Sequence, residues 1–166
     1  MWVKMAEYFD PFTKKTPMES ESKNILQVKK LNPKAILPTR GHSGDAGLDL
    51  YTLNDKPIIL KPHGFVKVPT GIAIKLPEGT TGLVQPRSSA FGRGLWVHGV
   101  IDSPYVGEVF LMITNLSDHD IAIEPFSRYA QMVIVKYENI VVAEVSELPT
   151  TERGDRGFGS SGLGVK

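Results

Sequence analysis

The chain has 166 residues, a formal net charge of +1 and 22% charged residues. This length fits one domain with a single hydrophobic core. The nearly neutral charge predicts no stable binding to nucleic acid, and no segment approaches the ~20 apolar residues of a membrane span. The absence of cysteine excludes disulfides, thiolate metal sites and a cysteine nucleophile. We therefore expect a soluble, cytoplasmic protein, or one of the host cytosol if the source is a virus or phage.

The chain divides into three parts by composition. Residues 1–23 mix charges, prolines and a Ser/Glu cluster without apolar periodicity, which predicts a flexible N-terminal extension. Such an arm is a candidate for contact with a protein partner. Residues 24–148 are expected to form a β-rich core, and residues 149–166 a flexible glycine-rich tail.

The core begins with short alternating runs broken by proline and glycine, a pattern typical of an all-β domain with closely spaced turns. In the run 71–77, the side chains of Ile72, Ile74 and Leu76 fall on one face, because the strand pleat has a period of two. The same alternation recurs over 109–113. We therefore expect these runs to be strands with one buried face.

The second half of the core continues this pattern. Residues 121–123 alternate in the same way, and the stretch 129–145 is rich in β-branched residues, which favour strands. One short helical turn is expected at 88–91, ended by Gly92 and Gly94.

Arg87, Ser88 and Ser89 stand where an expected strand gives way to this helical turn. Free amides at such a turn favour an anion, and a guanidinium binds phosphate oxygens in a bidentate way. The alternative is a serine that caps the turn and an arginine in a surface ion pair. Taken alone, this segment fits both interpretations.

The segment 99–108 is a second candidate. Asp102 ends an apolar run before a Ser-Pro turn, and Tyr105 follows three residues later. An acid in this position can orient and deprotonate a water molecule, and the aromatic ring can pack against a flat or ring-shaped substrate. The local pattern equally fits a turn residue followed by a core tyrosine.

Asp49 and Gln131 each place a polar group among strand residues. A buried Asp49 needs a cationic partner, which a hydrated metal or an arginine such as Arg128 would supply. The tail segment 153–162 combines glycines, hydroxyls and arginines around one aromatic residue, Phe158. This composition fits either a disordered tail or a loop that binds phosphates and stacks on a base.

Taken together and in this order, these five segments resemble the motifs of the trimeric dUTPase family, over about residues 25–162. The resemblance implies an all-β, jelly-roll-like barrel or sandwich with one short helix. It also implies a homotrimer that exchanges C-terminal tails between subunits, with active sites at the subunit interfaces. The implied reaction is hydrolysis of dUTP to dUMP and pyrophosphate, which limits uracil incorporation into DNA and supplies dUMP for dTMP synthesis. The implied cofactor is Mg²⁺.

The same resemblance assigns roles to individual residues. Asp102 activates the water that attacks the α-phosphorus, and Tyr105 packs against the deoxyribose. Asp49 contacts magnesium through water, with the metal held mainly by substrate phosphates, and Arg128 supports the site from behind. The other residues implied to bind substrate are Arg87, Ser88, Ser89, Gly99, Val100, Ile101, Gln131, Arg153, Phe158, Gly159, Ser160 and Ser161. Of these, the backbone around Gly99 and Val100 would read the uracil edge from a hairpin, and the tail would close over the phosphates.

Three features depart from the family pattern. Leu48 stands where an aromatic residue is common, and Val106 replaces a polar or basic residue. The stretch between Arg87 and Asp102, which contains His98, is shortened. Because this stretch holds the hairpin expected to read uracil, the shortening bears on base selectivity more than on phosphate chemistry.

Two alternatives belong to other functional classes. A dCTP deaminase, or a bifunctional deaminase and diphosphatase, shares the fold and an Arg-Ser-Ser segment. It would need an acid suited to proton shuttling at C4 of cytosine in place of the Ile-Asp-x-x-Tyr arrangement. A non-enzymatic trimeric β protein with a partner-binding arm would have no need of Asp102, Tyr105 or the tail motif.

Overall fold

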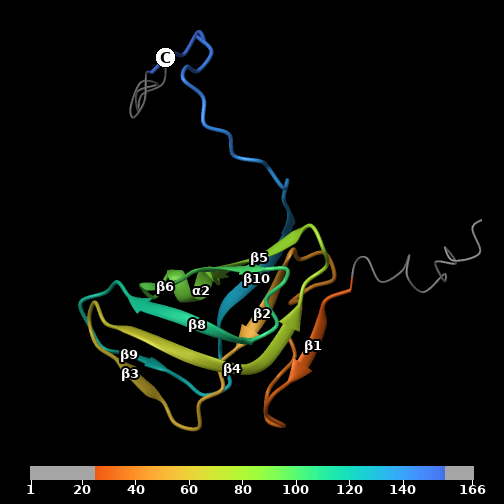
Figure 1. The fold of residues 1–166 in the computed structure, drawn as a ribbon. Helices are drawn as coiled ribbons and strands as arrows, with labels where there is room; N and C mark the ends of the chain where they lie inside the picture. The colour runs from red at the N-terminus through yellow and green to blue at the C-terminus, as the bar shows by residue number, and fades with distance from the viewer. Residues whose placement is uncertain (1–24, 156–166) are drawn as a thin grey trace, which may run out of the picture.

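The computed structural model describes residues 25–155, which form ten β-strands and one short helix (Figure 1). The elements in chain order are β1 (Gln27–Lys30), β2 (Gly47–Tyr51), β3 (Ile58–Leu60), β4 (Phe65–Lys75), β5 (Thr80–Pro86), α2 (Ser88–Phe91), β6 (Leu95–Val97), β7 (Gly99–Asp102), β8 (Glu108–Asn115), β9 (Ile121–Ile123) and β10 (Arg128–Lys136). Within this range no helix is long and apolar enough to cross a membrane.

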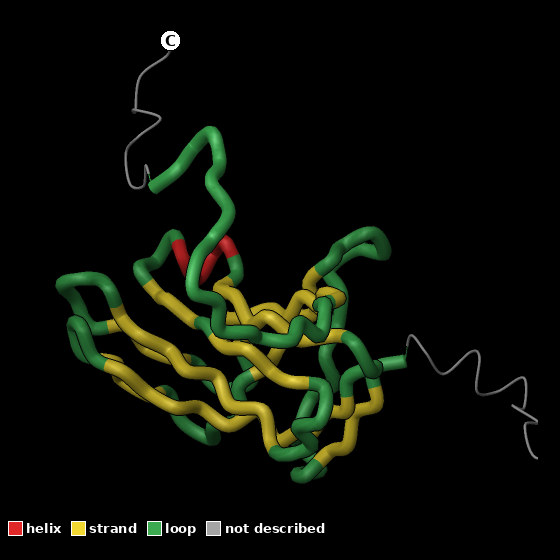
Figure 2. The backbone as a smooth tube through the Cα atoms, turned by 45° about the horizontal axis from the view of Figure 1, so that its top comes forward, coloured by secondary structure: helices red, strands yellow, loops and turns green. Residues whose placement is uncertain are grey.

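The strands form two four-stranded sheets and one separate pair. One sheet has the order β1-β4-β8-β6, the other has the order β2-β10-β5-β7, and β3 pairs with β9. Neighbouring strands are antiparallel throughout, and both sheets contribute to one hydrophobic core. Figure 2 shows the strands in yellow and the single short helix in red. The prediction of an all-β fold with a single short helix is confirmed.

The core follows from the predicted alternation. In β8, Val109, Leu111 and Ile113 are buried, whereas the residues between them point outward and are partly or fully exposed. In β4, Ile72 and Ile74 are buried as expected, but Gly71 and Ala73 beside them are buried too, so the second half of this strand is covered on both faces. A strand with one apolar face therefore packs that face against the opposite sheet.

The helix α2 has the predicted position and end. Arg87 is its N-cap in an extended conformation, and no side chain caps the helix, so the serine-cap alternative is not observed. Gly92 follows the last helical residue, and Gly94 has a φ of 82°, in the left-handed region that favours glycine. The hydroxyls of Ser88 and Ser89 therefore do not serve as helix caps.

The β-branched stretch expected over 129–145 is a strand only in its first half. β10 ends at Lys136, and residues 137–155 form no strand and lead away from the two sheets (Figure 1). Strand structure thus ends before 148, the boundary expected for the core. A β-branched sequence favours an extended backbone, but a strand also requires a neighbour for its hydrogen bonds, and residues 25–155 provide none there.

The core makes a direct prediction for stability. Leu111 is fully buried, so Leu111→Ala is expected to lower the free energy of unfolding by roughly 2–5 kcal/mol. Leu116, just beyond β8, is 54% exposed and supplies the matched control, because Leu116→Ala removes the same atoms from a surface position. Chemical denaturation at one protein concentration measures both variants. Equal losses in the two variants would contradict this assignment of the core.

Candidate active site

A buried carboxylate lies between two arginines at one end of the second sheet. Asp49 in β2 is 5% exposed. Its Oδ1 is 2.9 Å from Nε of Arg87, and its Oδ2 is 3.0 Å from Nη1 of Arg128. The sequence allowed either a hydrated metal or an arginine as the partner of Asp49, and in the structure its partners are the two arginines. Two guanidinium groups against one carboxylate leave one positive charge, and both arginine side chains remain partly exposed.

The strand pairing explains why these groups meet. β10 lies between β2 and β5, so that Gln131 pairs with Asp49 on one side and with Gln85 on the other. Arg87 follows β5 directly, and its backbone N–H donates to the carbonyl of Tyr129 at 3.0 Å. The first turn of α2 is therefore fixed beside β10.

Three further predicted residues complete this group, which we call the phosphate cluster: Asp49, Arg87, Ser88, Ser89, Arg128 and Gln131. Ser88 and Ser89 lie at the start of α2, and both are exposed. The side-chain amide of Gln131 donates to the Pro86 carbonyl at 3.4 Å. A Cβ atom on Gly47 would clash with the Gln131 side chain, so glycine at that position leaves room for it. The cluster presents guanidinium, hydroxyl and amide groups on one surface, a donor set suited to phosphate oxygens.

The second predicted group lies at the other end of β5. β7 pairs with β5 so that Asp102 faces Thr81. The N–H of Tyr105 donates to the Asp102 carbonyl at 3.0 Å and closes a turn. The Asp102 side chain is exposed and has no hydrogen-bond or ion-pair partner in the part of the chain that the structure describes. Its carboxylate is free to accept a proton from water.

Tyr105 is not a core residue, so the alternative of a turn followed by a core tyrosine is wrong. The residue is 45% exposed, and its hydroxyl donates to the carbonyl of Glu108 at 2.8 Å. The ring lies against Gly107, where an added Cβ would clash with it. The aromatic face is thus held at the surface next to Asp102, as a ring that packs on a substrate must be.

The strands of the stretch expected to read uracil, β6 and β7, do not pair with each other. β6 pairs with β8, β7 pairs with β5, and His98 alone connects β6 to β7. A hairpin turn needs at least about two residues in its loop, so one connecting residue sends the chain from one sheet to the other. β7 is instead an edge strand, and an edge strand presents unpaired backbone N–H and C=O groups. Gly99, Val100 and Ile101 all lie on this edge.

One chain does not bring the two groups together. Thr81, which pairs with Asp102, and Arg87 are six residues apart along β5. At ~3.3 Å per strand residue this separation is about 20 Å. The phosphate cluster and the Asp102 turn therefore occupy opposite ends of the same strand.

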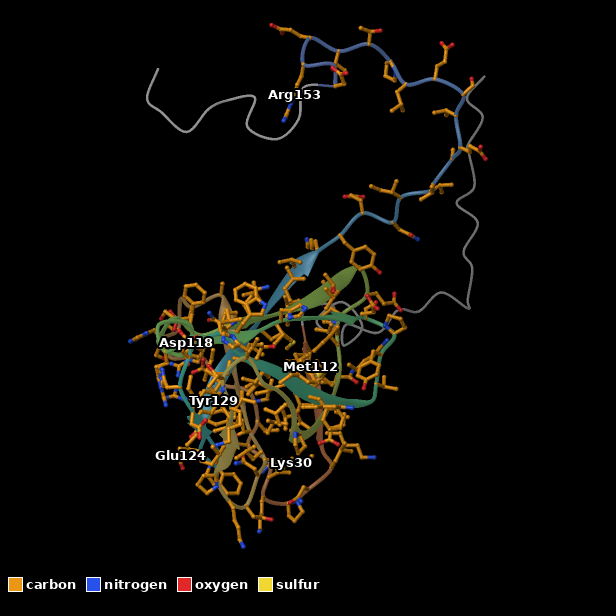
Figure 3. The ribbon with its side chains drawn as sticks, turned by 90° about the vertical axis from the view of Figure 1, so that its left-hand side faces the viewer. Lys30, Met112, Asp118, Glu124, Tyr129 and Arg153 are labelled. Atoms are coloured by element: carbon orange, nitrogen blue, oxygen red, sulfur yellow. The ribbon has the colours of Figure 1, made fainter. Side chains whose placement is uncertain are left out.

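The tail residues fall into two groups. Arg153 lies at the end of the segment 137–155, far from both sheets (Figure 3). Phe158, Gly159, Ser160 and Ser161 lie outside the described residues, as does the N-terminal extension 1–23. Their predicted roles stay predictions.

Two residues that sequence reasoning did not single out also contact the Asp102 turn or its flanks. Nζ of Lys75 donates to the carbonyl of Ser103 at 2.9 Å, and Oε1 of Glu108 accepts from the N–H of Gly71 at 2.9 Å. Both contacts join residues far apart in the sequence, so only the register of the strands brings them together. No local motif signals either contact.

The described residues do not fit a protein-built metal centre. They contain no group of three or more His, Asp or Glu that could hold a metal ion. Both oxygens of Asp49 contact guanidinium groups, and the side chain is almost fully buried. Little of this carboxylate remains for a metal-bound water.

Comparison with known proteins gives a consistent result. A family model described as dUTPase matches residues 33–162. The deoxyuridine 5'-triphosphate nucleotidohydrolase of Hydrogenobaculum sp. (strain Y04AAS1) is 45% identical over 142 residues, covering 83% of this chain and 98% of the relative. The protein of the same name from Oryza sativa subsp. japonica is 43% identical over 141 residues, covering 84% and 81%.

Solved structures agree. The Staphylococcus bacteriophage 80alpha dUTPase with dUPNHPP matches with a TM-score of 0.77 and 31% identity, covering 84% of this chain and 99% of that one. A mutant dUTPase of the S. aureus phage phi11, described with a structural Mg(II) ion, matches with a TM-score of 0.69 and 26% identity, covering 76% and 100%. On the sequence match, the fold and the arrangement of the phosphate cluster and the Asp102 turn, the chain belongs to the dUTPase family.

Proposed function

We propose that the protein hydrolyses dUTP to dUMP and pyrophosphate, with Asp102 as the general base. The observation that carries the assignment of the base is its carboxylate, which is exposed, has no partner among residues 25–155 and lies beside an exposed tyrosine. The named relatives are dUTP nucleotidohydrolases, which favours this activity over a dCTP deaminase or a non-enzymatic β protein.

In the proposed reaction, Asp102 accepts a proton from a water molecule as that water attacks the α-phosphorus. The bond from the α-phosphorus to the bridging oxygen breaks, and pyrophosphate leaves. Negative charge grows on the leaving phosphates in this step. The uncompensated positive charge of Arg87 and Arg128 around Asp49, with the hydroxyls of Ser88 and Ser89 and the amide of Gln131, stabilises it.

Substrate selection is assigned to the turn and the edge strand. The Tyr105 ring packs on the deoxyribose and leaves no room for a 2′-hydroxyl, which excludes UTP. The backbone groups of Gly99, Val100 and Ile101 hydrogen-bond to the uracil edge from the free side of β7. The free backbone groups of an edge strand can bind the base without a hairpin. The single-residue connection at His98 is therefore compatible with recognition of uracil.

We also propose a homotrimer in which each active site combines residues of different subunits. The separation of about 20 Å between the two ends of β5 is too long for one triphosphate to contact Arg87 and Asp102 of the same chain. A neighbouring subunit must therefore supply one of the two groups.

The segment 137–155 supports this assembly. Its exposed apolar side chains are Tyr137, Ile140, Val141, Val142, Val145 and Leu148, with Val142 94% exposed. So many exposed apolar side chains in one segment indicate a contact surface. Its 19 residues span up to about 60 Å when fully extended, so the segment can cross a neighbour and deliver Arg153 and the tail to that neighbour's site.

Magnesium is proposed to arrive with the substrate. The phi11 dUTPase structure is described with a structural Mg(II) ion, but the residues around Asp49 in this chain do not form a metal site. Mg²⁺ commonly keeps several waters and is held by substrate phosphates, where it neutralises part of their charge.

The role of Asp102 is tested by Asp102→Asn. Turnover of dUTP is expected to fall by about 10²–10⁴, the usual value of general-base assistance, while a non-hydrolysable dUTP analogue binds as before. Asp118→Asn supplies the control, because its side chain is 97% exposed and lies outside the site. Steady-state kinetics and calorimetric binding measure both quantities. Near-normal turnover of D102N would remove Asp102 from the mechanism.

Shared sites are tested by co-expressing two inactive variants. Ser88→Asp places a negative charge among the phosphate contacts, and an acid is tolerated at a helix start. Asp102→Asn removes the base. If one site uses Ser88 and Asp102 of different subunits, random mixing leaves about a quarter of the sites intact, and activity returns. Each variant expressed alone is the control. If mixed trimers stay inactive, each site belongs to a single chain.

The metal proposal predicts that Mg²⁺ stabilises the protein only together with nucleotide. Mg²⁺ alone is expected to leave the Tm unchanged, because the described residues supply no metal site. Mg²⁺ with a non-hydrolysable dUTP analogue is expected to raise the Tm above that seen with the analogue alone. A clear rise with Mg²⁺ alone would show a resident metal site and contradict the proposal.

A further inference from the structure

The loop that carries Asp102 and Tyr105 is attached to the end of strand β4 at two points. Nζ of Lys75 donates to the carbonyl of Ser103 at 2.9 Å, and the N–H of Gly71 donates to Oε1 of Glu108 at 2.9 Å. These contacts join the loop to the first sheet, whereas β7 before it belongs to the second sheet. The loop therefore bridges the two sheets, and β4 fixes both of its ends.

The first attachment lies directly beside the proposed base. Ser103 is 7% exposed and follows Asp102 in the chain. A buried carbonyl without a hydrogen-bond partner is destabilising, and the lysine ammonium satisfies this one with a charge-assisted bond. The Tyr105 N–H also donates to the Asp102 carbonyl, so hydrogen bonds hold the backbone carbonyls of both Asp102 and Ser103.

The second attachment holds the tyrosine independently. The Tyr105 hydroxyl donates to the carbonyl of Glu108, and the carboxylate of Glu108 accepts from Gly71. The bare Cα of Gly107 lets the Tyr105 ring lie against the backbone. Loss of the Lys75 contact therefore leaves Tyr105 in place and loosens only the Asp102 side of the loop.

The shape of β4 makes these contacts available. Its pairing with β8 shifts register between Pro69 and Ala73, and Gly71 within that irregularity has a φ of 68°. The left-handed backbone turns the Gly71 N–H toward the Glu108 side chain. Lys75 is the last residue of the strand, and its side chain is only partly exposed.

We propose that Lys75 is a positioning residue that fixes the direction of the Asp102 carboxylate. This inference rests on the proposed role of Asp102 as the general base. A base displaced by a fraction of an ångström loses much of its effect on the chemical step, whereas substrate held by the phosphate cluster and Tyr105 stays bound. Lys75 therefore acts on turnover and leaves substrate binding unchanged.

The test compares Lys75→Met with Lys67→Met in steady-state hydrolysis of dUTP. Lys67 lies on the same strand, with its ammonium 3.9 Å from the centroid of the Phe110 ring, and it does not touch the loop. Lys75→Met is expected to lower kcat by roughly 10- to 100-fold with little change in KM, and Lys67→Met is expected to change neither. Lys75→Arg, which keeps a cationic donor, is expected to recover most of the lost turnover.

Several outcomes would overturn the inference. They are an unchanged kcat in Lys75→Met, a raised KM with unchanged kcat, and an equal loss in Lys67→Met. If Lys75→Met melts below the assay temperature, Lys75→Arg and Lys75→Gln replace it, and equal activity of this polar pair contradicts the inference. Asp102→Asn in the same assay separates the two proposals, because an active D102N overturns the role of Asp102 itself. An inactive D102N beside a fully active Lys75→Met overturns only the positioning role.

Discussion

Strand β5 is hydrogen-bonded on both sides, and this pairing determines where the chemistry lies. β10 accompanies it from Thr80 to Pro86, and β7 pairs with its first half. A strand held in this way is stiff and cannot fold back to bring its ends together. The proposed base at one end and the proposed phosphate contacts at the other are therefore kept apart in one chain, and the proposed assembly of several chains follows from that separation.

The arginines around Asp49 show how one set of contacts can stabilise the fold and also prepare the proposed phosphate site. A buried carboxylate is costly unless cations and hydrogen bonds compensate for it, and Arg87 and Arg128 do so from two different elements. The same contacts hold the guanidinium groups in fixed positions at the surface. A phosphate that binds there meets donors that need no reorganisation, which is the general source of electrostatic stabilisation in enzymes.

The sequence predicts features that depend on neighbouring residues. Alternation over 109–113 predicted which side chains are buried, and the glycines after Phe91 predicted where the helix ends. An aspartate among strand residues predicted a cationic partner. Features that depend on register were missed, such as the contact of Lys75 with Ser103, 28 residues away.

Two other differences have physical reasons of the same kind. The resemblance implies a hairpin between Arg87 and Asp102, whereas β6 and β7 pair with different strands, because the single residue between them leads β7 into the other sheet. The β-branched residues after Lys136 favour an extended backbone, yet a strand also needs a partner, and no sequence pattern shows whether that partner lies in the same chain.

The exposed segment after β10 has a consequence for how the protein is made. Apolar extended segments can pair with the wrong neighbour while a chain is still incomplete, which is a common route to aggregation. Here the segment follows every strand of both sheets, so it leaves the ribosome after them. The two sheets can therefore form their core before the exposed apolar segment after β10 has been synthesised. Its position after the last strand thus favours contact with chains that have already folded over contact with incompletely folded ones.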